Sequence, residues 1–151
     1  MNLSKTSQYA LKILNYMVIN EGDVFTAKSL NAKLKIPHQY LRRLLTKLSN
    51  RGLIKGGKGR GGGYIIAKSY DSIFLADVLK ATGEPEIFNS CIFGFSDCLL
   101  AESCRIHDKW SEARENIIQV LQTTNLSHLK KDKSNNIKNK NLKTKRKKNY
   151  G

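Results

Sequence analysis

The segment GGKGRGGG, residues 56–63, constrains the fold of this chain more than any other feature. It holds six of the eleven glycines, and short apolar runs flank it at residues 53–55 and 64–66. Two strand-like runs joined by a glycine-rich loop predict a β-hairpin. Lys58 and Arg60 would place positive charge at the flexible tip of this hairpin.

Three amphipathic helices are predicted before the hairpin, because apolar residues recur there at intervals of three and four. Thr26 is the expected N-cap of the second helix, Pro37 the expected first residue of the third, and Gly52 its expected end. The residues predicted to face inward are Ala10, Ile13, Leu14 and Met17 in the first helix, Ala27, Leu30 and Leu34 in the second, and Leu41, Leu44, Leu45 and Leu48 in the third.

The outward face of the third helix is basic and polar. Two helices joined by a short turn, the second with such a face, are typical of a DNA-binding helix-turn-helix, and the hairpin would be the wing of a winged helix. The candidate DNA-binding residues are His38, Gln39, Tyr40, Arg42, Arg43 and Thr46 on the helix, and Lys58 and Arg60 on the wing.

The charge of the chain supports a polyanionic partner. Twenty-seven Lys and Arg against twelve Asp and Glu give a net charge of +15, which favours nucleic acid first and an acidic membrane surface second. Residues 1–68 carry 13 basic and 2 acidic side chains, residues 69–128 carry 4 and 9, and residues 129–151 carry 10 and 1. The last segment has almost nothing apolar to bury, so we expect a disordered basic tail.

Several classes of protein are disfavoured. No apolar run is long enough for a membrane span, and the first residues lack the pattern of a secretory signal. Three cysteines fit a reducing compartment better than a disulfide framework, so we expect a cytoplasmic protein. Two near-matches to nucleotide-binding loops in residues 52–62 fail, because a strand follows in place of a helix and Gly59 stands where Ser or Thr must hold magnesium. No catalytic set is recognisable, so an enzyme is not expected.

All three cysteines fall within fourteen residues, and His107 follows the last of them. Cys91, Cys98, Cys104 and His107 are candidate metal ligands, since thiolates and imidazole bind iron–sulfur clusters and zinc. The wide spacing favours a bulkier inorganic group over structural zinc. Unliganded thiols that serve packing or redox chemistry are the alternative reading of the residues alone.

A helix over residues 72–83 and a last helix that runs to about Leu126 complete the predicted folded body. The apolar seam of the last helix predicts that it packs against a second copy of the chain, as a homodimer. The seam residues are Ile106, Trp110, Ala113, Ile117, Val120 and Thr124.

Over residues 1–128 the sequence resembles the Rrf-two family of bacterial winged-helix transcriptional regulators. The likeness rests on residues 7–11, 36–41 and 51–54, the wing 58–64 and the Cys–Cys–Cys–His block. The resemblance implies a regulator, with repression favoured, whose binding to operator DNA is controlled by an iron–sulfur cluster that senses iron, redox or nitric oxide stress. It implies Cys91, Cys98, Cys104 and His107 as the ligands, and a two-iron (2Fe-2S) cluster over a four-iron (4Fe-4S) one.

The sequence departs from the family pattern in the wing, where Lys58 and Arg60 replace Arg and Pro, and at Arg42, where Glu or Gln is common. The alternatives are a metal-free or zinc-bound regulator that senses thiol oxidation or a metabolite, and a non-specific architectural protein that binds nucleic acid.

The predicted fold is mainly α. Residues 1–83 would form the winged helix-turn-helix, 84–128 the cysteine loop and dimerisation helix, and 129–151 the tail.

Overall fold

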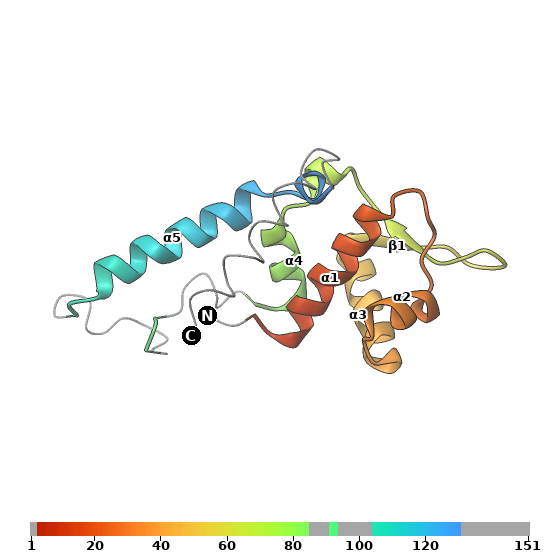
Figure 1. Ribbon diagram of the computed structural model, residues 1–151, viewed down its shortest axis with the longest axis horizontal. Helices are drawn as coiled ribbons and strands as arrows, with labels where there is room; N and C mark the ends of the chain where they lie inside the picture. Colours follow the sequence, from red (N-terminus) through yellow and green to blue (C-terminus); the bar gives the residue numbers. More distant parts are fainter. Residues whose placement is uncertain (1–2, 85–90, 94–103, 131–151) are drawn as a thin grey trace, which may run out of the picture.

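A computed structural model describes residues 3–84, 91–93 and 104–130. The predicted winged helix is confirmed: three helices precede a two-stranded antiparallel sheet, and two further helices follow (Figure 1). The elements are α1 (Lys5–Ile19), α2 (Ala27–Leu34), α3 (His38–Asn50), β1 (Ile54–Gly56), β2 (Tyr64–Ile66), the 3-10 turn η1 (Tyr70–Ser72), α4 (Leu75–Thr82), α5 (His107–Thr123) and the 3-10 turn η3 (Leu126–Leu129).

Local chemistry explains where the first helices begin. The Ser4 hydroxyl caps α1 by accepting the Ser7 N–H at 3.2 Å. Thr26 caps α2 as expected, in a reciprocal pair with Ser29 in which each side-chain oxygen accepts the other residue's N–H. Pro37 differs from the prediction, because it lies at the N-cap of α3 and its carbonyl accepts the Leu41 N–H. The missing proline N–H is therefore outside the helix and costs no helical hydrogen bond.

The turn between α2 and α3 is tight. Lys35 adopts a left-handed conformation (φ 56°), and its N–H closes the end of α2 on the Asn31 carbonyl. The Asn31 side chain donates to the Ile36 carbonyl at 2.7 Å, which holds this turn. These bonds fix the angle at which α3 leaves α2.

The hydrophobic core lies among α1, α3, α4 and the base of the sheet. It contains the leucines predicted to face inward from α3, whereas Ala27 and Leu34 of α2 are only half-buried and pack at its edge. The core residues are Ala10, Ile13, Leu14, Met17, Val18, Phe25, Leu30, Ile36, Leu41, Leu44, Leu45, Leu48, Leu53, Ile54, Ile73, Val78, Ala81 and Leu126.

The wing has strands of the predicted length, and it is better anchored than the sequence indicated. β1 begins one residue later than predicted, and Ile54 pairs with Ile66 while Gly56 pairs with Tyr64. Phe25, just before α2, also exchanges both backbone hydrogen bonds with Tyr64, at 3.0 and 2.7 Å. The segment before α2 therefore holds the wing against the helices.

The predicted helix over 72–83 is wrong at its start, and the last helix ends earlier than expected. Residues 70–72 form η1, and α4 begins at Leu75, where Asp77 accepts the Phe74 N–H. After α5 the chain pairs with the segment before α4: the Leu126 N–H donates to the Ile73 carbonyl and the Leu75 N–H to the Thr124 carbonyl, both at 2.9 Å. This pairing stops α5 at Thr123.

Figure 1 shows α5 projecting from the helical body on the side opposite the wing. None of the described helices has the length and apolar character that crossing a membrane requires. Of the expected tail, residues 129–151, Leu129 ends η3 and Lys130 pairs with Glu21, while residues 131–151 lie outside the described residues, as does Cys98.

Candidate nucleic-acid interface and cysteine site

The outward face of α3 presents most of its predicted DNA-binding residues to solvent. The side chains of His38, Gln39, Arg42, Arg43 and Thr46 are exposed, while the leucines on the other face anchor the helix in the core. The Thr46 hydroxyl donates to the Arg42 carbonyl at 3.0 Å, one turn back along the helix. A helix held from behind in this way can offer its polar face to a groove in a partner.

Tyr40 is placed differently from its neighbours. It is half-buried, its hydroxyl hydrogen-bonds to the Thr6 hydroxyl, and its ring meets Tyr9 edge-on at 5.6 Å between centroids. These contacts join the start of α3 to α1. Tyr40 therefore helps to fix the position of the recognition face relative to the body of the protein.

The wing presents Lys58 and Arg60 at its exposed tip. The Gly62 N–H donates to the Gly59 carbonyl at 3.0 Å, which closes a turn around Arg60. A Cβ atom on Gly62 would lie 2.5 Å from the Gly57 carbonyl oxygen, so only glycine allows this close approach. The glycines thus make a narrow tip that carries two cations.

A groove separates the wing from the helices. Its walls include Thr26 before α2, Thr46, Ser49 and Asn50 on α3, and Lys58 on the wing. Thr26, Ser49 and Asn50 were not among the DNA-binding residues predicted from the sequence. The spacing of 46, 49 and 50 at helical intervals could have indicated the two on α3, but Thr26 reaches the groove only through the fold. Hydroxyl and amide groups here suit hydrogen bonds to phosphate oxygens.

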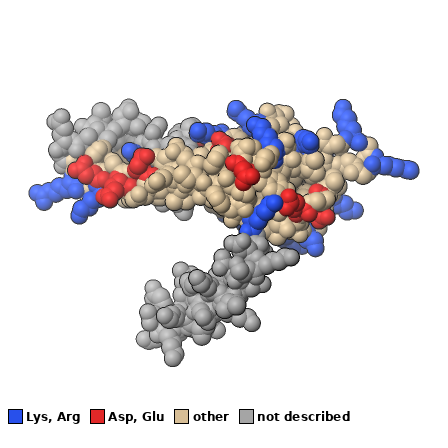
Figure 2. Space-filling view, turned by 90° about the horizontal axis from the view of Figure 1, so that it is seen from above, with Lys and Arg blue, Asp and Glu red and all other residues tan. Residues whose placement is uncertain are grey.

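The charge is distributed unevenly along the molecule. Figure 2 shows Lys and Arg side chains projecting at the end that carries the wing, whereas toward the end that carries α5 Asp and Glu side chains lie beside Lys and Arg. The acidic residues at the start of α5 include Asp108, Glu112 and Glu115. A polyanion would therefore approach the winged-helix end.

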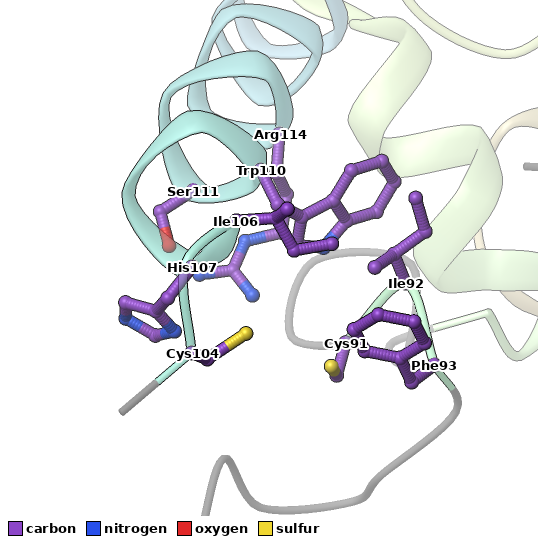
Figure 3. Close-up of a pocket in the computed structure, with 9 residues that line it drawn as sticks. All are labelled: Cys91, Ile92, Phe93, Cys104, Ile106, His107, Trp110, Ser111 and Arg114. Carbon is purple, nitrogen blue, oxygen red and sulfur yellow. The ribbon is translucent and has the colours of Figure 1, made fainter. Parts of the chain in front are cut away.

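The second site lies at the start of α5. Cys91 and Cys104 are free, half-buried thiols that line one pocket together with His107, Trp110 and Arg114. Figure 3 shows the Cys104 sulfur turned toward the side on which Cys91 lies, with the His107 imidazole on the other side of Cys104. His107 is the first residue of α5, and its N–H donates to the Cys104 carbonyl at 3.1 Å. Cys104 therefore precedes the helix and lies two residues before its N-cap, Ile106.

The donor set fits an iron–sulfur cluster in chemistry. Two thiols and an imidazole line the same pocket, and the Nε atom of Arg114 is buried there with no hydrogen-bond partner among the described residues. A cationic donor without such a partner beside two thiols suits an anionic, thiolate-ligated group. Within residues 3–84, 91–93 and 104–130, no three His, Cys, Asp or Glu side chains are grouped closely enough to hold a metal ion. The third predicted thiol, Cys98, lies outside these ranges.

Comparison with known proteins places the chain in a family. Residues 3–132 match the model of the Rrf2 family, described as an iron-dependent transcriptional regulator. The HTH-type transcriptional regulator NsrR of Geobacillus kaustophilus is 27% identical over 136 residues, covering 89% of this chain and 92% of the relative. The HTH-type transcriptional regulator IscR of Xenorhabdus nematophila is 28% identical over 134 residues, covering 87% and 80%.

A solved structure agrees with these matches. CymR, the global cysteine regulator of B. subtilis, has a TM-score of 0.71 and 25% identity, and the likeness covers 85% of this chain and 95% of CymR. NsrR and IscR are named as transcriptional regulators, and the matching family model is described in the same way, so the expectation that the chain is not an enzyme is confirmed. With its winged helix, its basic recognition face and a family match over 130 residues, the chain is a member of the Rrf2 family of DNA-binding transcriptional regulators.

Proposed function

We propose that this Rrf2-family protein is a cytoplasmic repressor that binds an operator in double-stranded DNA as a homodimer, under the control of an iron–sulfur cluster. The observation that carries the proposal is the combination of an exposed basic recognition helix with two free thiols and an imidazole around one pocket. The description of the family as an iron-dependent transcriptional regulator supports the proposed control by an iron-containing group.

The DNA would be read by α3 and clamped by the wing. His38, Gln39, Arg42 and Arg43 would approach base edges in the major groove, because their side chains are exposed on one rigid helix. Lys58 and Arg60 would enter the minor groove or contact phosphates. Thr46 would line the intervening groove, and Tyr40 would stay at the edge of the interface with its hydroxyl on Thr6.

The homodimer would form through α5. Within one chain, no residue of this seventeen-residue helix is fully buried, and Val120 is 58% exposed. A long helix with a wide apolar seam stabilises a soluble protein best when a second copy covers that seam. Two copies would also present two recognition helices, as a two-fold operator requires.

Cys91, Cys98, Cys104 and His107 would hold the cluster, with a two-iron cluster favoured over a four-iron one. When bound, the cluster would supply a group whose charge and stability depend on iron and on oxidants. Arg114 would donate to the anionic site, and Trp110 would limit the access of water. The pocket lies at the start of α5, so a change there could alter how the two DNA-binding heads of the dimer are placed.

The test is anaerobic purification followed by a visible spectrum and counts of iron and sulfide, with molar mass from sedimentation. Sulfur-to-iron absorption and a dimer are expected.

His107→Cys should keep the cluster but lower its reduction potential and weaken the pH dependence of that potential, since thiolate is anionic and imidazole neutral. His107→Ala should lose the cluster faster in air, and Ala at any of the three cysteines should do more damage. If the His107→Ala protein equals the parent in cluster content, in the reduction potential of the cluster and in the pH dependence of that potential, His107 is not a ligand.

A cluster-free regulator that senses thiol oxidation is the second candidate. It is favoured by the free thiols of Cys91 and Cys104 in one pocket, and by the likeness to CymR, the global cysteine regulator of B. subtilis. A colourless, iron-free protein whose DNA binding changes on oxidation would support this candidate and contradict the cluster. Zinc in place of iron would support a zinc-bound regulator.

A further inference from the structure

We infer a second ligand site, a pocket for a small polyvalent anion between the C-terminal end of α3 and α4. The pocket has a volume of about 430 Å³. That is enough for a metabolite of ordinary size. The site goes beyond the proposed function, because the described residues that line it include neither a cysteine nor any of the proposed DNA-contacting residues.

Three cations surround the pocket. Arg51 comes from the end of α3, Lys68 from the segment after β2 and Lys80 from α4, and all three are exposed. In the described part of the chain the one ion pair is Glu21–Lys130, so none of the three cations is neutralised there by a carboxylate. Cations that converge from three separate segments without salt-bridge partners form a site for an anion.

Among the described residues that line the pocket, one carries a carboxylate, and that carboxylate is already engaged. The Oδ2 atom of Asp77 accepts the Phe74 N–H at 3.0 Å, at the start of α4. The charge around the pocket is therefore three positive against one negative, and the negative charge is turned toward the backbone of its own helix. A ligand with two or more negative charges would balance the excess.

Part of the lining of the pocket is apolar. Leu53, Ile73 and Ala81 contribute this part, and each is buried in the protein. Three cations together with an apolar lining fit anionic groups carried on a short skeleton, such as a phosphorylated or polycarboxylate metabolite.

The position of the pocket favours a small ligand over the DNA backbone. Arg51 follows Arg42 by nine residues, about two and a half helical turns, so the two side chains leave α3 on opposite sides. On the flank toward α4, the Lys47 ammonium donates to the Thr82 carbonyl at 3.0 Å and ties the two helices together. An anion bound here would contact α3 from behind its proposed reading face, and would join it to α4, which packs against α5.

The test uses the full chain with sodium pyrophosphate and sodium citrate as probes, against sodium chloride at equal ionic strength. Calorimetric titration and thermal unfolding should show saturable binding and a rise in the melting temperature with at least one probe. The double variant Lys68→Gln/Lys80→Gln should bind that probe at least tenfold more weakly. Lys28→Gln/Lys33→Gln on α2 removes the same charge from exposed positions and should bind as the parent does.

Three results would overturn the inference. If the two double variants lose binding equally, or if neither probe binds the parent, the pocket has no specific anion site. If Lys68→Gln/Lys80→Gln keeps its response to the probes but loses affinity for duplex DNA, the pocket is a contact for the DNA backbone and not a site for a small anion. Circular dichroism checks that each variant is folded, and Arg51→Gln serves as a second variant if the double change impairs folding. Duplex binding by the parent is measured separately, so a failure here is distinct from a failure of the proposed function.

Discussion

Ser4, Ser7 and Glu84 join the start of α1 to the end of α4. Ser7 is fully buried, with its hydroxyl 2.5 Å from that of Thr82, and the Ser4 N–H donates to the Glu84 carboxylate. Burial by itself would raise the pKa of Glu84, but hydrogen bonds from Ser4 and Ser7 outweigh it and hold that pKa below its ordinary value. The folded protein therefore favours the charged form of this side chain.

Glu84→Gln should make the protein less stable at neutral pH, and the difference should shrink in acid. Because the pKa is lowered in the folded state, the stabilisation is fully present above the unfolded value of about 4.3 and is lost as the pH falls through the folded value. Urea unfolding of both proteins from pH 7 to pH 3 checks this, with Glu112→Gln on α5 as an exposed control. A difference that stays constant over this range would mean that Glu84 acts through its shape and not through its charge.

Among the elements, η3 has a larger structural role than its four residues suggest. Leu126 is fully buried in the winged-helix core, and η3 packs against α1. The Leu126 N–H is bonded to the Ile73 carbonyl, so this turn returns the chain from α5 to the body. The turn therefore fixes one end of α5 relative to the recognition helix.

Leu126→Ala should destabilise the protein by about 2–5 kcal/mol, because it removes a buried side chain and leaves a cavity. The free energy of unfolding from urea titration measures this change. Val24→Ala, at a side chain 53% exposed, should alter stability by about 0.5 kcal/mol or less. A Leu126→Ala protein as stable as the control would show that η3 is not held in the core in solution.

The recognition helix and the wing should make different contributions to DNA binding. Arg42→Ala/Arg43→Ala should weaken discrimination between operator and random duplex, because base edges carry the sequence information. The expected loss is about 1–3 kcal/mol for each base contact that the variant no longer makes. Lys58→Ala/Arg60→Ala should lower affinity for both duplexes similarly, since phosphate contacts are shared. Fluorescence anisotropy with both duplexes measures the two effects. Equal losses on operator and random DNA for both double variants would contradict this division.

The sequence was informative where structure depends on neighbouring residues. The leucines of α3 and the Thr26 cap were predictable because helical spacing and capping are local, and the glycine run specified a hairpin. The pairing of Phe25 with Tyr64 was not predictable, because it joins residues far apart in the chain. The same holds for Leu126, which the spacing assigned to the end of a long helix and the fold assigns to the core. At the cysteine site, residue types indicated the chemistry, but only the fold brought Arg114 beside two of the thiols.

On the scale of the whole molecule, positive charge is carried at the winged-helix end and again in the last part of the sequence. Residues 131–151 hold nine Lys and Arg and one Asp. Lys130, just before them, is fixed by an ion pair of 2.8 Å with Glu21 and lies 4.7 Å above the Tyr70 ring. The described chain is therefore anchored at Lys130, close to the end of α1, and a truncation after Lys130 keeps that anchor intact.

Deleting residues 131–151 should weaken binding to random duplex DNA and leave the preference for an operator unchanged. Each phosphate that loses its cationic partner should flatten the plot of log affinity against log salt by about 0.9, because fewer counterions are released on binding. Affinities for operator and random duplex across a series of salt concentrations measure both effects. A full-length variant with Gln at the nine basic positions separates charge from chain length, and should behave as the truncation does. If either protein loses its preference for the operator, the segment contributes to sequence recognition, and its role as a non-specific electrostatic arm is wrong.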